Sequence, residues 1–349
     1  MTIEIGIASL SDIQPTTVDG RTRSVEARSA QIVDLGVLAD EVGLDTFGLG
    51  EHHSVDFAVS SPAVVLAAIA SRTTAIRLSS AVTTLSALDP VRVYQDFASL
   101  NLVSAGRAEI IVGRSAYPEP FALFGAPIEA YDALFAEKLD LLLQIRDHPA
   151  VTWSGRFRTA LTDATIPPRP RSELPIWLGV GGTPASAVRA GHLGLPVVFG
   201  HIGGDAGRLV HLAAAYREAG VAAGTTDRLS VGLALHYLAV DGPTDAEASY
   251  PYYRDFLRPK KPGGGGFVVE PAQFRRGLES DGHLMIGTSE QVVEKLTALS
   301  TLLDLDRIQL LADWGGLPEE QVEHSVRVLG EVIAPELRKR DLRAGESGA

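Results

Sequence analysis

The sequence predicts an α/β fold, a single (β/α)8 barrel, from three observations. A short apolar run, a loop rich in Gly, Ser, Thr or His, and a stretch with apolar residues every three or four positions recur in that order. The 349 residues fit the usual size of such a barrel. No glycine-rich dinucleotide fingerprint follows the first apolar run, where Ser9–Pro15 stands instead. A doubly wound sheet is therefore the less favoured alternative.

The elements follow one another as strand and helix along the chain. Apolar runs of four to seven residues, typical of buried parallel strands, predict most of the strands, which are expected at Ile3–Ala8, Thr46–Gly50, Ile76–Val82, Ala108–Val112, Ile176–Val180, Val197–Gly200, Val231–Val240 and Arg307–Ala312. Helical spacing predicts the segments between them, at Val25–Val42, Pro62–Arg72, Val91–Val103, Tyr131–Ile145, Pro184–His192, Gly207–Ala219, Asp245–Arg258, Glu290–Leu303 and Glu319–Arg340.

Two insertions interrupt this period. His148–Pro175 is expected to form a hairpin and a proline-rich passage after the fourth helix. Pro259–Gly282 follows the seventh strand and contains four successive glycines, whose ordering costs much entropy. We expect one domain over residues 1–349, with the 259–282 insertion either a mobile lid over the barrel mouth or a disordered surface loop.

Composition restricts the partners and the compartment. The chain has 31 basic and 43 acidic residues, a net charge of −12, which disfavours binding to nucleic acid or to anionic lipid. It has no cysteine, so a disulfide framework and thiolate chemistry are excluded. No secretory leader or membrane-spanning apolar stretch is evident. A cytoplasmic protein that acts on small molecules is the expectation.

Three polar residues, Glu51, His52 and His53, directly follow the second predicted strand. Catalytic groups of this fold lie at the carboxyl ends of its strands, so this stretch is a candidate active site. Neighbouring residues in an extended chain point to opposite sides, so one imidazole is expected to face a ligand and the other the protein.

Metal and Schiff-base chemistry are disfavoured. Neither a His-x-His pair nor a His-Glu-x-x-His helix is present, and His201 and His236, at later strand ends, are more typical of hydrogen-bonded structural residues. We therefore expect no metal site. The few lysines lie on predicted helices or in the second insertion, never at a strand end, so an aldolase-like nucleophile is missing.

Two loops after neighbouring strands suggest an anion site. Gly113-Arg114-Ser115-Ala116 follows the fourth strand, and Gly181-Gly182-Thr183-Pro184-Ala185-Ser186 follows the fifth and opens a helix. Glycines allow close backbone approach, Thr183 is suited to cap the helix, and the amides with Ser186 can hold a phosphate. Arg114 would add charge-assisted hydrogen bonds. The competing interpretation of the second loop is an ordinary helix start.

These segments together resemble the bacterial luciferase-like, flavin-dependent monooxygenases. The order and spacing of the matching stretches carry the resemblance, which runs through Asp40–His53, Ser61–Leu66, Ile76–Val82, Asp89–Arg92, Asp96–Leu100, Ser104–Arg107, Val112–Arg114, Leu174–Leu178, Gly181–Pro184, Ile286–Leu296 and Leu329–Pro335. It is closer to the oxidoreductases of that family than to the light-emitting luciferases.

The resemblance implies a barrel that binds FMN at the carboxyl ends of its strands. It implies that the phosphate is held by Arg114, Ala116, Gly182, Thr183 and Ser186. It further implies a cis peptide bond between Ala81 and Val82 against the isoalloxazine ring, with His52 beside the reacting edge of the flavin. Ser115 departs from the family pattern, in which glycine is usual.

The function implied is oxygenation of a small organic substrate by reduced FMN and O₂ through a flavin C4a-hydroperoxide, with His52 as the catalytic residue. A separate flavin reductase is an expected partner because no nicotinamide motif is visible. A homodimer that pairs through Pro62–Ala70 is also expected. The alternatives are hydride transfer with F420 and a non-catalytic flavin-binding protein.

Overall fold

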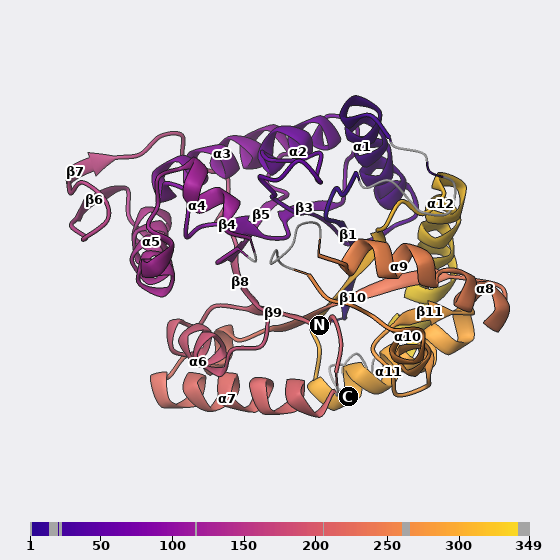
Figure 1. Ribbon diagram of the computed structural model, residues 1–349. Helices are drawn as coiled ribbons and strands as arrows, with labels where there is room; N and C mark the ends of the chain where they lie inside the picture. The colour runs from indigo at the N-terminus through magenta and orange to yellow at the C-terminus, as the bar shows by residue number, and fades with distance from the viewer. Residues whose placement is uncertain are drawn as a thin grey trace.

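Eight parallel strands close into a barrel that helices surround (Figure 1). The computed structural model describes residues 2–13, 20, 23–115, 117–204, 206–259 and 266–340. The barrel strands are β1 (Glu4–Ser9), β2 (Thr46–Leu49), β3 (Arg77–Ser80), β5 (Ala108–Gly113), β8 (Ile176–Val180), β9 (Val197–Gly200), β10 (Val231–Ala239) and β12 (Arg307–Asp313). Each pairs in parallel with the next, and β12 pairs back onto β1, which closes the ring. The predicted fold class is confirmed.

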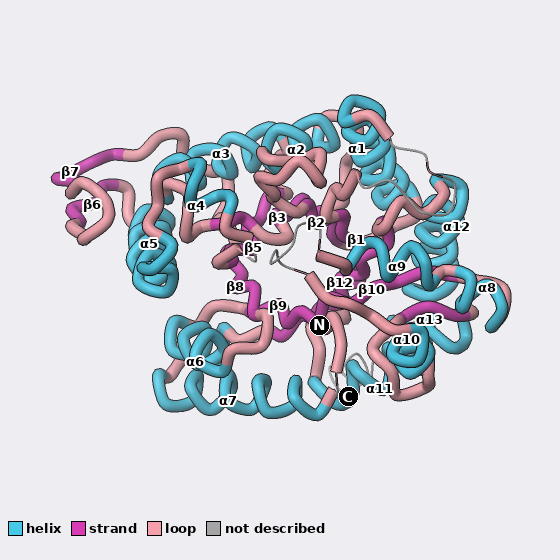
Figure 2. Tube along the Cα trace, viewed as in Figure 1, coloured by secondary structure: helices cyan, strands magenta, loops and turns pink. Residues whose placement is uncertain are grey.

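The helices form the outer layer of the barrel (Figure 2). They are α1 (Val25–Glu41), α2 (Pro62–Ala70), α3 (Pro90–Val103), α4 (Glu119–Leu123), α5 (Tyr131–Asp147), α6 (Pro184–Leu193), α7 (Gly207–Ala223), α8 (Pro243–Ala248), α9 (Tyr250–Leu257), α10 (Pro271–Leu278), α11 (Ser289–Leu303), α12 (Glu319–Val328) and α13 (Ala334–Arg340). The single helices predicted over 245–258 and 319–340 are each divided, the first near Ser249 and the second by a π-helical turn over Leu329–Ile333.

Local sequence signals explain many helix boundaries. Asp89 accepts hydrogen bonds from two first-turn amides of α3, and Pro90 takes the first helical position. At α11, Thr288 and Gln291 form a reciprocal capping box. Helix α6 ends at Gly194 in the left-handed conformation, which glycine adopts without steric cost.

Four short strands lie outside the ring. The predicted hairpin is present as β6 (Ala150–Trp153) and β7 (Leu161–Thr165), which pair antiparallel and project from the barrel beside α5 (Figure 1). β4 (Thr83–Thr84) pairs with the end of β5. β11 (Met285–Gly287) was not predicted, and it pairs only with the final residues of β10, beyond the part of β10 that belongs to the ring.

The barrel interior is ionic near the amino ends of its strands. Arg307 of β12 donates to Glu109 of β5 at 3.0 Å and to Glu4 of β1 at 2.8 Å, and its guanidinium lies 3.9 Å from the ring centroid of Trp177. Burial opposes the charge on Arg307, but the two carboxylates outweigh burial and raise its pKa. This layer ties strands from different parts of the chain below the mouth.

The insertion after β10 is partly described. Residues 260–265, which include most of the glycine run, lie outside the described residues, whereas Pro271–Leu278 forms α10. Among the described residues, no helix combines the length and the apolar character needed to cross a membrane.

Candidate functional site

The floor of the barrel mouth is built from very small residues. The peptide bond between Ala81 and Val82 is cis, as the resemblance implies. The Val82 side chain lies against Gly113 and Gly179, and a Cβ at Gly179 would come within 2.8 Å of it. At Gly181 and Gly200 a Cβ would meet no atom within 4 Å. The floor therefore leaves space in which a flat ring system can lie against the backbone.

Arg114 and Thr183, predicted to bind the same phosphate, lie side by side. Nη2 of Arg114 donates to the Thr183 hydroxyl at 3.2 Å, although the residues belong to loops after different strands. Thr183 occupies the N-cap of α6, but it makes no capping hydrogen bond, contrary to expectation, because its hydroxyl faces Arg114. Arg114 also pairs with the exposed Asp132 at 2.5 Å. An anion bound here would compete with that carboxylate.

Three further residues, Ser115, Ser186 and Ala116, belong to the loops of the predicted anion site. Ser115 has φ 80°, a left-handed conformation that explains why glycine is usual at this position. Its hydroxyl accepts from the Tyr117 amide at 3.1 Å, which helps to hold the turn. Ser186 lies buried in the first turn of α6. Ala116 lies outside the described residues.

Sequence reasoning missed Arg208, which stands in the first turn of α7. Its Nη2 donates to the carbonyl of Gly181 at 3.0 Å, and its guanidinium fills the space that a Cβ at Gly182 would occupy. Gly182 has φ 124°, which strongly favours glycine. A second arginine therefore lies beside the predicted phosphate loop. Its position at a helix start after a barrel strand was the available signal.

His52 lies partly buried at the mouth, with its ring stacked on Phe57 at 3.8 Å and in edge contact with Tyr117 at 5.6 Å. Burial, reinforced by the neighbouring His53 ring, lowers the pKa of His52 from 6.5 to about 3. Its Nδ1 is buried without a hydrogen-bond partner. Among the described residues, no group thus uses the hydrogen-bonding capacity of this nitrogen in the neutral ring.

His53 faces the protein, which agrees with the predicted division between the two imidazoles. Its Nε2 lies 2.9 Å from Oε1 of Glu51, and its ring contacts Phe124 edge-on at 5.0 Å. The same Glu51 oxygen accepts a short hydrogen bond from Thr84. Both side chains of the Glu51–His53 pair are nearly buried. Glu51 thus fixes the turn that carries His52.

A second imidazole without partners lies across the mouth. His236 of β10 is 1% exposed, and neither ring nitrogen has a hydrogen-bond partner, contrary to the expected hydrogen-bonded structural residue. Tyr253, Phe256 and Trp314 contact its ring at 5.1 to 5.9 Å. Burial, with a smaller effect of the His283 ring, lowers the pKa of His236 to about 3. Helix α9 therefore supplies an aromatic wall to this sector.

The expectation of no metal centre remains a prediction. Among the described residues, no group of three or more His, Asp or Glu side chains has the arrangement needed to hold a metal ion. His201 lies 5.8 Å from His283 between ring centroids, and His236 packs among aromatic rings.

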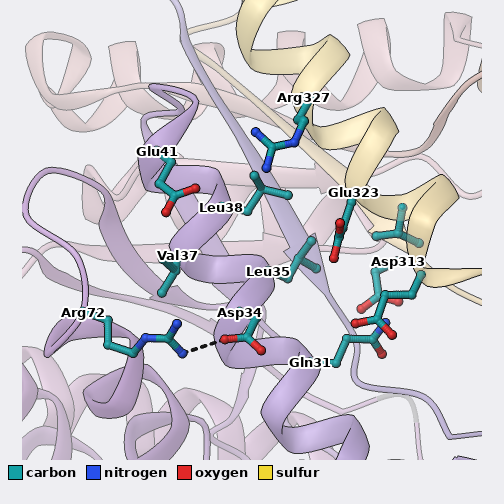
Figure 3. Close-up of a pocket in the computed structure, with 12 residues that line it drawn as sticks. Gln31, Asp34, Leu35, Val37, Leu38, Glu41, Arg72, Asp313, Glu323 and Arg327 are labelled. Carbon is teal, nitrogen blue, oxygen red and sulfur yellow. Dashed lines mark hydrogen bonds and ion pairs between the residues drawn. The ribbon is translucent and has the colours of Figure 1, made fainter.

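A surface hollow of about 210 Å³ lies between α1 and α12 in the outer layer (Figure 3). Charged side chains dominate its lining, and the guanidinium of Arg72 pairs with Asp34 at 2.6 Å. None of the predicted site residues lines it. The mouth residues described above remain the candidate site.

Comparison with known sequences places the chain among related proteins. It is 27% identical over 334 residues to the uncharacterized protein y4vJ of Sinorhizobium fredii, which covers 88% of this chain and 91% of that one. It is 28% identical over 189 residues to an F420-dependent glucose-6-phosphate dehydrogenase of Kineococcus radiotolerans, over 52% of this chain and 55% of that one.

Solved structures share the fold. The monooxygenase RslO1 from Streptomyces bottropensis superposes with a TM-score of 0.78 at 21% identity, over 95% of this chain and 99% of that one. The oxygenating constituent of 3,6-diketocamphane monooxygenase from Pseudomonas putida, in complex with FMN, gives 0.73 at 19% identity, over 96% and 98%. The family model described as luciferase-like monooxygenase matches residues 3–305. The chain belongs to the luciferase-like monooxygenase family.

Proposed function

We propose that this protein is a flavin-dependent monooxygenase that uses reduced FMN and O₂ to oxygenate a small organic substrate. The observation that carries the proposal is the glycine floor around Val82 with a two-arginine loop cluster at its edge. A flat ring and a terminal phosphate are the two parts of FMN that such a floor and cluster would accept. The 3,6-diketocamphane enzyme, of the same fold, was solved with FMN.

The residues present fit FMN in both parts. Arg114, Arg208 and Thr183 would bind the phosphate together with the uncapped first-turn amides of α6. Val82 and the glycines beside it would carry the ring. When bound, reduced FMN supplies the electrons that activate O₂.

His52 acts in this proposal as a neutral base that takes up a proton, rather than as a resting imidazolium. With its pKa lowered to about 3, the imidazole is neutral near pH 7, and the ring can take up a proton from a bound group. An anion formed beside the ring would raise the pKa of His52 and let it hold the proton. Phe57 and Tyr117 keep its ring oriented.

The aromatic wall excludes water on the far side of the mouth. The Tyr253 hydroxyl donates to the carbonyl of Ile202 at 3.1 Å, which fastens α9 to the loop after β9. The 259–282 insertion follows directly and is proposed as the lid. A separate reductase is the proposed source of reduced FMN.

Hydride transfer with F420 is the second candidate, because the Kineococcus relative uses that cofactor. The two differ in whether O₂ is consumed. Reduced FMN or reduced F420 is offered to the purified chain with a panel of ketones, aldehydes and aromatic compounds. Product that carries label from ¹⁸O₂ with FMN supports the monooxygenase, whereas oxygen-independent turnover with F420 alone contradicts it.

The phosphate contacts have a separate test. Arg208→Ala should weaken FMN binding by about 10-fold or more, because a charge-assisted hydrogen bond contributes about 1.5–3 kcal/mol. Riboflavin, which lacks the phosphate, should bind both proteins alike. Arg217→Ala, on the same helix with its side chain bonded to the Leu303 carbonyl, is the matched control. Equal losses for FMN and riboflavin would refute the assignment.

A further inference from the structure

A half-open cavity of about 460 Å³ lies beside the loop that carries His52, under the β6–β7 hairpin and between the starts of α2 and α3. It contains none of the residues proposed to bind FMN, although Glu51 and His53 form part of its wall. Its volume is in the range of small-molecule sites.

The charges around this cavity are paired, with one exception. Asp89 pairs with Arg158 at 2.7 Å, Asp96 with Arg92 at 2.8 Å, and the remaining carboxylate, Glu51, with His53 at 2.9 Å.

The exception is the ammonium of Lys138, on α5. Its side chain lines the cavity and is 8% exposed, and no carboxylate among the described residues lies within 4.0 Å of Nζ. It donates only to the carbonyl of Ser86, at 2.8 Å. Burial lowers the pKa of Lys138, while Asp89 and Glu137 oppose that effect. A buried cation normally has a counter-ion, so this one is short of a partner.

A buried hydroxyl in the same cavity is also without a hydrogen-bond partner. Thr83 lines the cavity at 1% exposure, and its Oγ1 has no hydrogen-bond partner. Helix α2 begins at the cavity, and its N-cap, Ser61, makes no capping hydrogen bond. A buried hydroxyl without a partner costs free energy unless a ligand or water completes it. The Thr83 hydroxyl and the uncapped start of α2 thus offer unused hydrogen-bonding groups in the same cavity as Lys138.

The remaining wall is apolar. Leu88, Val93, Phe97, Phe124 and Phe157 also line the cavity. The cavity therefore combines a buried ammonium, in contact with no carboxylate of the described residues, with a hydrocarbon surface. A phosphate would find only one unpaired cation, whereas a carboxylate with an apolar body would match both halves.

We propose that this cavity is a second ligand site, which binds a small apolar carboxylic acid with its carboxylate on Lys138 and Thr83. The ligand would lie beside the Glu51–His53 pair and hence next to the turn that positions His52. The site is separate from the proposed flavin cradle and does not depend on the cofactor assignment.

Octanoate is the probe, and octan-1-ol is its uncharged counterpart. Calorimetric titration of the purified chain should show one octanoate bound per chain. Lys138→Met should weaken octanoate at least 10-fold and leave octan-1-ol unchanged, and Lys138→Arg should restore binding in part. Thr83→Val should give a smaller loss. Lys295→Met is the matched control, because Lys295 is another buried lysine but donates to the carbonyls of Gly277, Leu278 and Leu284.

Thermal unfolding of each variant separates loss of binding from loss of folding. Equal octanoate affinity in the native protein and a folded Lys138→Met variant would overturn the proposal, as would absence of octanoate binding at millimolar concentration. The carboxylate could instead belong to a second copy of the chain. In that case Lys138→Met weakens self-association in sedimentation equilibrium and the native dimer does not bind octanoate, which also overturns the small-molecule assignment.

Discussion

The two imidazoles of the Glu51-His52-His53 turn should respond oppositely to one identical substitution. His53→Phe removes the imidazole that Glu51 meets at 2.9 Å, and it leaves that carboxylate, 3% exposed, with Thr84 as its remaining side-chain partner. A buried acceptor deprived of a partner costs about 1–3 kcal/mol of unfolding free energy. His52→Phe keeps a ring on Phe57 and removes only the nitrogens, so its cost should stay below about 1 kcal/mol.

For substrate oxygenation, His52→Phe should have a larger effect than His53→Phe. His52→Phe deletes the imidazole nitrogens and should lower substrate oxygenation by about 10²-fold, because general acid–base groups contribute about 10²–10⁴. His53→Phe should retain most product formation in the folded fraction. Urea unfolding measures the change in unfolding free energy of each variant. Product formed per reduced FMN oxidised, with released hydrogen peroxide as the unproductive fraction, measures substrate oxygenation.

A double substitution tests the physical reason. If His53→Phe is destabilising because a carboxylate is left without its partner, Glu51→Gln in the same chain should recover part of the lost free energy. Additive costs would show that lost packing against Phe124 dominates. An unchanged product yield in His52→Phe would refute the role given to His52, even with the flavin cradle intact.

The remaining predictions concern the frame of the molecule. Arg307→Met should cost about 3–5 kcal/mol by urea unfolding because it strands a buried carboxylate, and adding Glu109→Gln should recover much of this, whereas equal stability of the single and native proteins would argue against the ionic layer. The folded pKa of His236, about 3, lies below its unfolded value of 6.5. The loss of stability caused by keeping this imidazole neutral in the folded protein is therefore absent well above pH 6.5, and it grows as the pH falls towards the folded pKa. Each pH unit in this window is worth about 1.4 kcal/mol, so His236→Phe should remove about 2 kcal/mol of the stability lost between about pH 7.5 and 5; an unaltered profile would count against this. Val64, 68% exposed, lies on α2, the helix proposed to pair two copies of the chain. Val64→Glu should therefore turn dimers into monomers in sedimentation, and an unchanged mass would show that this surface does not pair two copies.

Much of the barrel could be predicted because its signals are local. Apolar runs mark most of the barrel strands, since both faces of a parallel strand are buried, and Asp89-Pro90 marks the start of α3. The three-residue β11 carries too short a pattern to be recognised, and it exists through pairing with the end of β10. The division of the 319–340 helix had a signal, Pro335, which lies directly after the π-helical turn and removes a helical N–H, but the apolar spacing continues across it.

The candidate site was predictable in part for the same reason. His52, Arg114 and Thr183 follow strands, and the fold brings strand ends together. Arg208 was missed because a lone arginine in a helical pattern resembles a solvated surface residue. The hydroxyl of Thr183 was assigned to a cap because sequence cannot show that Arg114 lies close enough to bind it.

Strand β10 pairs with β9 and β12 through its first part and with β11 through its last residues. The segment between β10 and β11, which carries α8, α9 and α10, is therefore held by a ladder of its own outside the ring. Exchange of this segment between relatives would change the aromatic wall and the covering of the mouth while every hydrogen bond that closes the barrel stays in place. The segment that covers the mouth can thus be exchanged as one unit, with little effect on folding of the barrel. A chimera that keeps residues 231–239 and 285–287 should fold and carry the mouth covering of the donor protein.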